Sequence, residues 1–428
     1  MQNKAIRTAT GAFRTSPKVS LEVLSGIKPL EISRKQKLAN YTVRVFANPS
    51  NPIRKILESP STYEELPPES LTKLQQQSVR KRVRDAMAYY QVDLENIWVE
   101  EPVDFPPWQL NGIDRCGDVI KNAKSSIPEV TLNMVYRHHI ATHDSDNLIA
   151  YTDGSKTSDG VAFSMIAKPP SQPVVTKSFR IDDSTSSYSA ELHAILYVTL
   201  YAKRSNTRDL TIMSDSKSSI QALSSPYAKD PLVAEIQRSI HDADQKVLLC
   251  WVPSHIGIPG NEQADKLARG ATNAPVKIRN RLCRNDIKAV IRKKTIRSWQ
   301  DQWTAARNYP DRPNKLGEIT DSLSPLPNAT CSNRRWERSL ARLRLGHCRL
   351  TNGFLLSGGA PPECENCLNE VRLTVKHILT ECPAHRAARL RAFNSTTVTM
   401  KSLLKEGDTS HQGRLYKFLE ELRVLNEI

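Results

Sequence analysis

The middle of the chain, residues 147–275, is predicted to form a mixed α/β domain between segments that are mostly helical. Three observations lead to this expectation. Short apolar runs alternate there with helical patterns. Proline-rich breaks precede the segment, at residues 48–52, 60–68 and 102–107. A cluster of cysteines with one histidine follows it, which is typical of a metal-stabilised region in an intracellular protein.

Five strands and four helices account for the middle segment, in the order βββαβααβα. The strands are predicted at NLIAYTDGS (147–155), GVAFSMIA (160–167), PVVTKSFRI (173–181), DLTIMSDS (209–216) and KVLLCWVPS (246–254). The helices are predicted at 187–204, 217–225, 231–244 and 261–271, the last with Asn261 as its N-cap. This order favours one mixed sheet with helices packed against it.

The flanks carry helical patterns and the charge of the chain. Residues 1–146 combine helical stretches at 1–43 and 70–90 with a connector, and residues 276–428 begin with a linker that leads into a long basic helix at 284–308. The chain has 428 residues and a net charge of +16. The net charge is +3 for residues 1–150, 0 for 151–275 and +13 for 276–428. Such an excess predicts a nucleic-acid partner, with a solvated basic surface as the alternative.

Several classes of protein do not fit the composition. No apolar run approaches the roughly 18–20 residues of a membrane helix, and no secretory signal follows Met1. We therefore expect an intracellular protein, nuclear or cytoplasmic, without a membrane partner.

Four acidic residues stand at comparable places of the middle segment: Asp153, Glu191, Asp215 and Asp265. Residues at strand ends of an α/β sheet meet in one crevice, and four carboxylates there would repel one another unless divalent cations neutralised them. Hard oxygen ligands suit Mg²⁺ or Mn²⁺, and two such ions can support phosphodiester hydrolysis. The alternative is four ordinary surface acids.

Four sequence blocks around these acids resemble the type-1 ribonuclease H family. They are YTDGS (151–155), SAELHAI (189–195), SDSKSSI (214–220) and WVPSHIGIPGNEQADKLAR (251–269), in family order. The resemblance implies a ribonuclease H-like mixed five-stranded sheet with flanking helices. It implies that the four acids bind two Mg²⁺ (or Mn²⁺) ions and that His255 assists proton transfer or product departure.

The same resemblance suggests contacts to the substrate. The backbone at Gly154 and Ser155 would approach a phosphate or a 2′-hydroxyl, and Ser187, with Ser189, would face the minor groove. Both serines stand where bacterial members commonly have amides, and Lys217 stands where many members have glutamine. Lys217 would contact a phosphate instead.

The C-terminal region contains the pattern C-x2-C-x9-H-x4-C, formed by Cys364, Cys367, His377 and Cys382. Four ligands without an open position predict a closed tetrahedral zinc site, which is structural rather than catalytic. Free buried cysteines are the alternative, and His385 is a weaker candidate ligand.

A basic run between the two motif regions, residues 276–297, holds nine lysines and arginines against one aspartate. We expect it to hold phosphates of the substrate, through residues such as Arg292, Lys293 and Lys294. Trp299 and Trp303 follow it, and are expected to pack against the next helix rather than to bind bases.

The flanks also resemble parts of a larger assembly. The cysteine cluster with the upstream LARLRLGHCRLTNGFLL (340–356) resembles the C-terminal CCHC region of Jockey-like non-LTR retrotransposon polyproteins. The first 39 residues resemble the thumb-side end of the reverse transcriptase of these elements. The aspartate pair of a polymerase is missing, so no polymerase activity is expected from this chain, although a reverse transcriptase on the same or a longer polyprotein is an implied partner.

The sequence therefore predicts a metal-dependent endonuclease that hydrolyses the RNA strand of RNA–DNA hybrids, with RNA and DNA as its partners. A catalytically inert retrotransposon remnant that only binds nucleic acid is the alternative. A third hypothesis, an integrase or transposase of the same fold, is disfavoured by the order of the four acids and by the helix carrying GNEQAD (260–265).

Overall fold

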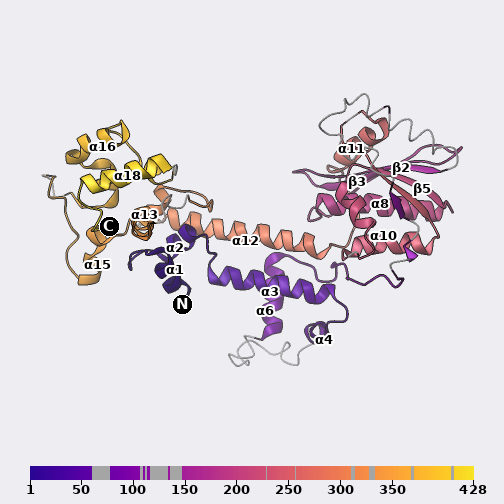
Figure 1. Cartoon of the computed structure of the whole chain (residues 1–428). Helices are drawn as coiled ribbons and strands as arrows, with labels where there is room; N and C mark the ends of the chain where they lie inside the picture. Colours follow the sequence, from indigo (N-terminus) through magenta and orange to yellow (C-terminus); the bar gives the residue numbers. More distant parts are fainter. Residues whose placement is uncertain are drawn as a thin grey trace. The chain divides into compact units, whose positions relative to one another are not determined.

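The computed structural model divides the chain into two compact units (Figure 1). One consists of residues 37–292, and the other of residues 1–36 together with 293–428. The structure describes residues 1–59, 78–106, 109–110, 113–115, 134, 147–227, 229–255, 257–309, 314–326, 333–367, 371–405 and 409–428. The three-part division at 146 and 275 stays a prediction.

The first unit is built on a mixed sheet with the strand order β1-β6-β5-β2-β3-β4. Its strands are β1 (Ile113–Arg115), β2 (Leu148–Lys156), β3 (Val161–Lys168), β4 (Val175–Ile181), β5 (Asp209–Ser214) and β6 (Lys246–Trp251). β2 and β4 pair antiparallel with β3, whereas β1, β6, β5 and β2 run parallel. The five predicted strands of the ribonuclease H-like sheet are thus confirmed. β1 adds a sixth strand at the edge, and three residues are too few to give a periodic signal.

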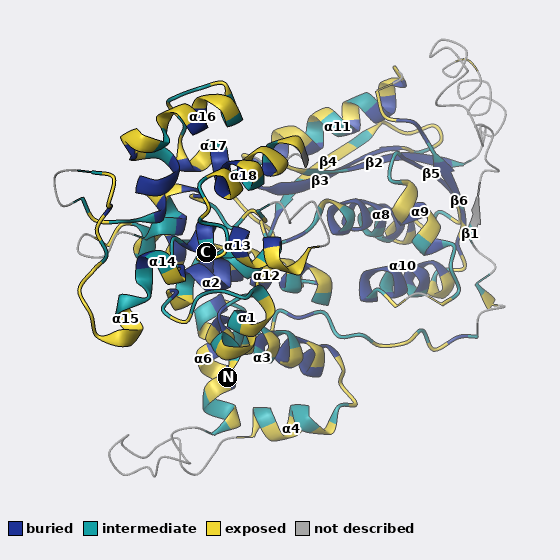
Figure 2. Ribbon diagram, turned by 60° about the vertical axis from the view of Figure 1, so that its left-hand side comes forward, coloured by how far each residue is buried: buried dark blue, intermediate teal, exposed yellow. Residues whose placement is uncertain are grey.

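Helices cover both faces of this sheet. α8 (Ser187–Arg204), α9 (Lys217–Leu223) and α10 (Pro231–Asp242) share one apolar core with Leu148 and Ala150 of β2. α11 (Pro259–Ala271) packs on the other face, against the alternate residues Ile149 and Tyr151. Both faces of β2 are therefore covered, and Figure 2 shows the central strands as buried. This explains why the strand is an apolar run rather than an alternating pattern.

A glycine sets the distance between β2 and α8. A Cβ atom on Gly154 would lie 2.4 Å from the backbone nitrogen of Glu191 and 2.6 Å from the carbonyl carbon of Ala190. Only a residue without a side chain allows the strand and the helix backbone to come this close. The contact joins the residue after Asp153 to Glu191 itself, so it fixes the spacing of two predicted metal ligands.

The segment after residue 276 belongs structurally to the sheet before it becomes helical. Ile278 donates its backbone N–H to the carbonyl of Arg180 in the edge strand β4, at 2.8 Å. The long helix α12 (Arg284–Arg307) begins only at Arg284, later than the basic run that starts at 276. An edge strand has unpaired backbone N–H and C=O groups, and the segment around Ile278 pairs with those of β4. This pairing keeps the first residues of the basic run out of the helix.

Further helices of the first unit form a small core of their own. The C-terminal half of α3 (Leu30–Ala47) and α6 (Val79–Tyr90) pack with the start of α12 through Val43, Met87, Tyr90, Ile287 and Ile291. Ser78 caps α6 by accepting from the N–H of Lys81. The earlier part of the helix predicted at 70–90 lies outside the described residues.

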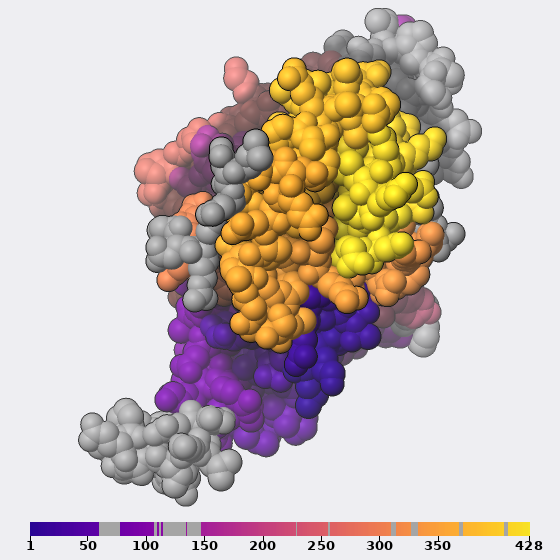
Figure 3. Space-filling view, turned by 90° about the vertical axis from the view of Figure 1, so that its left-hand side faces the viewer, coloured from indigo at the N-terminus to yellow at the C-terminus, as the bar shows by residue number. Residues whose placement is uncertain are grey.

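The second unit is α-helical. Its core joins α2 (Lys18–Ser25), the end of α12, α13 (Arg334–Leu345), α17 (Met400–Leu404) and α18 (Thr409–Glu421). Figure 3 shows the indigo N-terminal residues against the orange segment that follows α12. Trp303 is completely buried in this core and Trp299 is 7% exposed. The expectation that both tryptophans pack is confirmed. Within the described residues, no helix is long and apolar enough to cross a membrane.

Replacement of Gly154 by alanine is expected to destabilise the first unit. The added methyl group meets backbone atoms, which cannot rotate away, so the free energy of unfolding should fall by about 1–3 kcal/mol. Gly270→Ala in α11 is the matched control, because nothing lies within 4 Å of its new Cβ and its stability should rise by about 0.5–1 kcal/mol. Urea unfolding of both variants measures this. An unchanged midpoint for Gly154→Ala would mean that the close approach is not needed.

Candidate active site

Three of the four predicted acids meet at one edge of the sheet. One carboxylate oxygen each of Asp153, Glu191 and Asp215 lie within 4.8 Å of one another. β2 and β5 are parallel neighbours in which Thr152 pairs with Ser214, so the next residues of both strands, Asp153 and Asp215, emerge side by side. β2 continues to Lys156 rather than ending at the aspartate. Glu191 reaches the same point from the first turns of α8.

Burial and mutual repulsion keep these carboxyl groups from ionising freely. Burial, reinforced by the charges of Asp215 and Asp265, raises the pKa of Asp153 to about 7. Burial and the charges of Asp153 and Asp215 raise the pKa of Glu191 well above its usual value. The pKa of Asp215 is also raised, mainly by burial. Three carboxylates this close together repel one another when they are ionised, unless a positive charge is bound between them.

The donor set fits a divalent cation. One oxygen of Glu191, Oε2, is buried and has no hydrogen-bond partner among the described residues. Buried polar atoms are normally paired, so an orphaned carboxylate oxygen beside two further carboxylates indicates a ligand position. All three residues offer hard oxygen atoms, which are the atoms that Mg²⁺ and Mn²⁺ prefer.

Asp265 lies outside the three-carboxylate group. Its two oxygens are 3.1 and 3.3 Å from Nη2 of Arg269, one turn along α11. Its charge nevertheless raises the pKa of Asp153, Asp215 and Glu191, so it faces the same site. The structure therefore brings three of the four acids into contact and leaves the fourth at the rim, paired with an arginine.

His255 lies on the loop before α11, with its side chain 68% exposed. Its backbone is in the left-handed region, at a φ of 61°, and its Nδ1 is 3.9 Å from Oε2 of Glu262. The positive charge of His255, when protonated, lowers the pKa of Asp215. The histidine is thus close enough to the acids to act on them electrostatically and exposed enough to exchange protons with solvent.

The predicted N-cap of α11 is wrong. The helix begins at Pro259 with Ile258 as its N-cap, because proline at the first helical position has a suitable fixed φ and needs no N–H partner. Asn261 lies inside the first turn and is buried. Its side chain hydrogen-bonds to Asp215 and lowers the pKa of that carboxyl group. Asn261 therefore supports the site itself, which helix-capping rules could not indicate.

Among the predicted substrate contacts, Gly154 is joined to the acids, because its backbone N–H hydrogen-bonds to the carboxyl groups of Asp153 and Glu191 and lowers the pKa of both. Gly154 packs against α8, Ser155 is half-buried beside it, and Ser187 is exposed at the first position of α8. The ammonium group of Lys217 lies 5.5 Å from the ring centroid of Trp251. Ser189 is buried and donates its backbone N–H to the hydroxyl of Ser186, so it serves the helix cap.

The basic run is partly neutralised by acids. Lys277 pairs with Asp183, Arg279 with Asp93 at 3.5 Å, and Arg284 with Glu100 at 3.0 Å. Further along α12, Arg292 and Lys293 are exposed and Lys294 is half-buried. The exposed cations of this helix, rather than the whole run, are the groups that remain accessible to a polyanion.

Residues beyond the predicted domain support the helix that carries Glu191. Oδ1 of the buried Asp286 accepts the backbone N–H of Ser186, the N-cap of α8, at 3.1 Å. The side chain of Asn280 accepts from the N–H of Asp182 and donates to the hydroxyl of Thr185. No local motif in the sequence marks these two residues, because their partners lie about 95–100 residues away.

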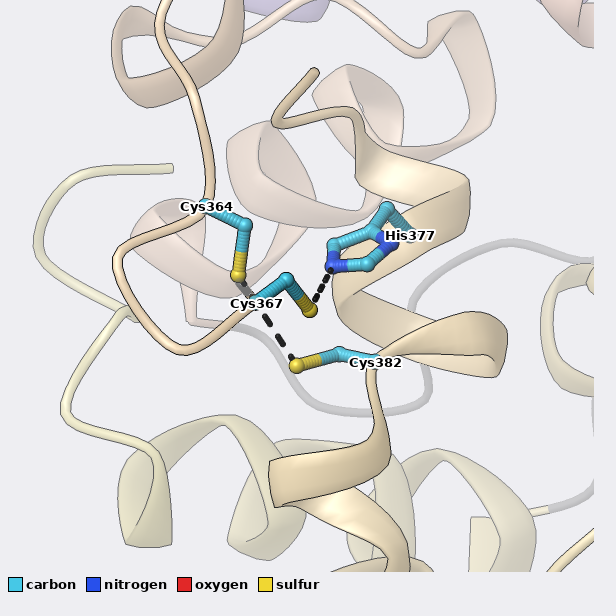
Figure 4. Close-up of side chains that lie close together, drawn as sticks. All are labelled: Cys364, Cys367, His377 and Cys382. Carbon is cyan, nitrogen blue, oxygen red and sulfur yellow. Dashed lines mark hydrogen bonds between the residues drawn. The ribbon is translucent and has the colours of Figure 1, made fainter. Parts of the chain in front are cut away.

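The four predicted zinc ligands also come together (Figure 4). Sγ of Cys364 is 3.9 Å from Sγ of Cys382, and Sγ of Cys367 is 3.5 Å from Nε2 of His377. With Zn–S and Zn–N bonds of about 2.3 and 2.0–2.1 Å, a tetrahedral site needs S···S and S···N separations of about 3.8 and 3.6 Å. The cluster thus fits a zinc ion. His385 is not in the cluster, because its Nδ1 lies 3.0 Å from the carbonyl of Ile378.

The metal-free protein is expected to lose stability as the pH rises from about 4 to about 7. Asp153 has a raised pKa in the folded state, so the folded protein holds a proton in this window that the unfolded chain has released. The Asp153→Asn variant should show a flatter pH profile of the free energy of unfolding. Mg²⁺ should stabilise the wild type more at pH 7.5 than at pH 5, because it binds the deprotonated carboxylates. Urea unfolding across this range measures both effects, and a stability that rises equally in both proteins would contradict the pKa assignment.

Comparisons with known proteins agree with this geometry. Residues 145–273 match the family model described as RNase H. The chain is 26% identical over 142 residues to ribonuclease H1 of Mus musculus, covering 29% of this chain and 50% of that protein. It is 27% identical over 134 residues to the Pol polyprotein of Ovine maedi visna related virus (strain South Africa), covering 30% of this chain and 11% of the polyprotein.

Among solved structures, RNase H1 from the halophilic archaeon Halobacterium salinarum NRC-1 matches with 20% identity and a TM-score of 0.25, covering 29% of this chain and 96% of that chain. The chain spans about half the length of the mouse protein and about a tenth of the polyprotein. The family model covers the segment that carries the four sequence blocks and the three neighbouring carboxylates. Residues 145–273 form an RNase H domain.

Proposed function

We propose that the chain is a metal-dependent endonuclease that hydrolyses the RNA strand of RNA–DNA hybrids. The observation that carries this proposal is the grouping, within 4.8 Å, of two buried carboxylates and one half-buried one, with an orphaned oxygen on Glu191, within the RNase H domain. Asp153, Glu191 and Asp215 would hold the catalytic ions, with Asp265 at the rim as a fourth ligand. Two bound Mg²⁺ or Mn²⁺ ions would activate a water molecule and neutralise the leaving oxygen.

The residues around the acids supply the other parts of the reaction. His255 is exposed and lies near Asp215, so it can take up or release the proton that accompanies departure of the product. The backbone at Gly154 and Ser155, together with the exposed hydroxyl of Ser187, would recognise the 2′-hydroxyls that distinguish RNA from DNA. Lys217 would contact a phosphate near the cleaved bond.

The holding of the substrate is proposed to be separate from its cleavage. Residues 151–275 are net neutral, so nonspecific phosphate attraction must come from elsewhere in the chain. The exposed residues Arg292 and Lys293, with Lys294, are the candidates on α12.

We further propose that Cys364, Cys367, His377 and Cys382 hold one structural zinc ion. All four positions are filled by protein atoms, which leaves no open position for catalysis. We also propose that the chain derives from a retrotransposon polyprotein and acts beside a reverse transcriptase. The resemblance of its flanks and the match to a Pol polyprotein support this origin.

Replacement of Asp215 by asparagine is expected to abolish Mg²⁺-dependent cleavage of a labelled RNA–DNA hybrid. Mutation of a residue that only hydrogen-bonds to a metal ligand typically lowers activity about 10–100-fold, so loss of a ligand itself should lower it more than about 100-fold. Asp209→Asn, an exposed aspartate at the start of the same strand, is the control and should cleave normally. A wild-type protein that binds the hybrid without cutting it would refute the enzyme and favour the inert remnant.

Metal analysis of the purified protein should find one zinc ion per chain. Cys382→Ser should lose it, together with part of the helical signal of the C-terminal region, because thiolate ligands are needed to bind zinc and zinc stabilises folding. Cys348→Ser is the control, since this buried cysteine lies outside the cluster and contacts the hydroxyl of Thr351. Retention of zinc by the Cys382 variant would argue against the site.

A further inference from the structure

The second unit contains a cavity of about 280 Å³ beside the cysteine cluster. Its wall is formed by η3 (Lys315–Glu318), the two residues after α13, α14 (Arg349–Asn352), α15 (Phe354–Ser357) and the segment 372–376, which becomes helical at residue 375. This volume is near the lower end of the range of small-molecule sites, about 300–1,000 Å³. Neither the carboxylate site nor the predicted substrate contacts involve these residues.

Cations outnumber acids around the cavity. Lys315, Arg372 and Lys376 line it, against Glu318 alone. The two lysines form ion pairs, Lys315 with Glu318 at 3.7 Å and Lys376 with Glu381 at 3.2 Å. Such partly exposed pairs are worth little, so a phosphate could displace them. The exposed guanidinium of Arg372, which lines the cavity, lies 5.5 Å from the ring centroid of Phe354, the residue next to the lining residue Leu355.

The inner wall combines apolar side chains with polar groups that can hydrogen-bond to the edge of a heterocyclic base. Leu355, half-exposed, and the buried Met400 supply apolar contact. His347 is fixed by a contact of its Nδ1 with the hydroxyl of Thr15 at 2.9 Å, and burial lowers its pKa to about 4. It is therefore neutral at pH 7, and with Nδ1 bonded to Thr15 its Nε2 is the ring nitrogen left to donate to or accept from a ligand. The side-chain oxygen of Asn352 accepts from Thr351 at 2.6 Å, which leaves its amide N–H groups as donors.

The cysteine cluster shapes one wall of the cavity. The segment 372–376 ends at the ligand His377, whose backbone N–H donates to the hydroxyl of Thr374 at 3.0 Å. The same segment pairs with residues next to Cys364, through Leu373 N–H to Pro362 at 2.8 Å. A metal that joins Cys364 to His377 would therefore hold both strands of this pair in register.

We infer that this cavity binds one unpaired nucleotide of a nucleic-acid strand, and that the cysteine cluster keeps its wall in place. The phosphate lies against Arg372 and Lys315, and the base lies on the apolar side near Phe354, with His347 and Asn352 at its edge. Stacking on aromatic rings and guanidinium groups combined with a cationic rim is the general chemistry by which proteins hold single strands. The inference concerns a site apart from the carboxylates and does not depend on cleavage.

The test is binding of a fluorescein-labelled ten-nucleotide oligo-dT and oligo-U to the full chain, by fluorescence anisotropy without Mg²⁺. Arg372→Ala should raise the Kd about 5-fold or more and reduce its dependence on salt, since a phosphate contact is lost. Phe354→Ala should weaken binding to a similar extent because stacking is lost. Arg391→Ala removes the same charge from an exposed arginine paired with Glu421, and should change the Kd less than about 2-fold.

Further measurements distinguish binding in the cavity from general attraction between a basic chain and a polyanion. Cys382→Ser should weaken binding as much as Arg372→Ala, and the two changes together should weaken it little further, because both remove one site. Equal effects of Arg372→Ala and Arg391→Ala would overturn the inference, as would a free mononucleotide that binds as tightly as the strands. Hybrid cleavage by Arg372→Ala should continue at saturating substrate. A wild-type chain that fails to cleave would refute the nuclease and leave the binding result standing.

Discussion

The close approach of three carboxylates, two of them buried and one half-buried, is the constraint on which the RNase H domain depends. The parallel register of β2 and β5 places Asp153 beside Asp215, and the missing side chain of Gly154 lets α8 bring Glu191 to them. Each of these contacts raises the pKa of its neighbours, so the folded state carries an electrostatic cost at neutral pH. The arrangement, with apolar cores on both sides of the sheet, fits a cation that would offset this cost.

The helix α8, which carries Glu191, and the loop before it are fixed by hydrogen bonds from two separate parts of the chain. Lys156, at the end of the strand that carries Asp153, donates to the carbonyl of Thr185 at 2.5 Å. Asn280 and Asp286 approach the same loop from the other side, and Cys283 is buried in the core shared by β2 and α8. The family match ends at residue 273, whereas these contacts extend to residue 286. The segment that matches the family is therefore shorter than the structure that supports the site.

The sequence predicted the parts of the site that depend on local pattern. Long apolar runs bounded by turn residues identified five strands, and the blocks around Asp153, Glu191 and Asp215 identified the acids that meet. β1 was missed because three residues have no period, whereas the long basic helix predicted to begin at Arg284 does begin there, as α12. Asn261 and Asp286 act through partners far along the chain, so no spacing rule could have assigned them.

The distribution of charge along the chain favours separate sites for the proposed cleavage of the substrate and for its binding. The neutral RNase H domain concentrates negative charge at its acids, which repel a polyanion unless cations cover them. Part of the basic run forms ion pairs, with Asp183 of this domain and with Asp93 and Glu100 of the segment that precedes it. Attraction for a polyanion would then come from exposed cations of α12 and from the second unit, where lysine and arginine side chains line a cavity together with apolar residues. A nucleic-acid strand held in the cavity by stacking as well as by charge would remain bound at salt concentrations that screen the cations of α12. The two parts of the chain would therefore contribute differently to the affinity for nucleic acid and to its dependence on salt.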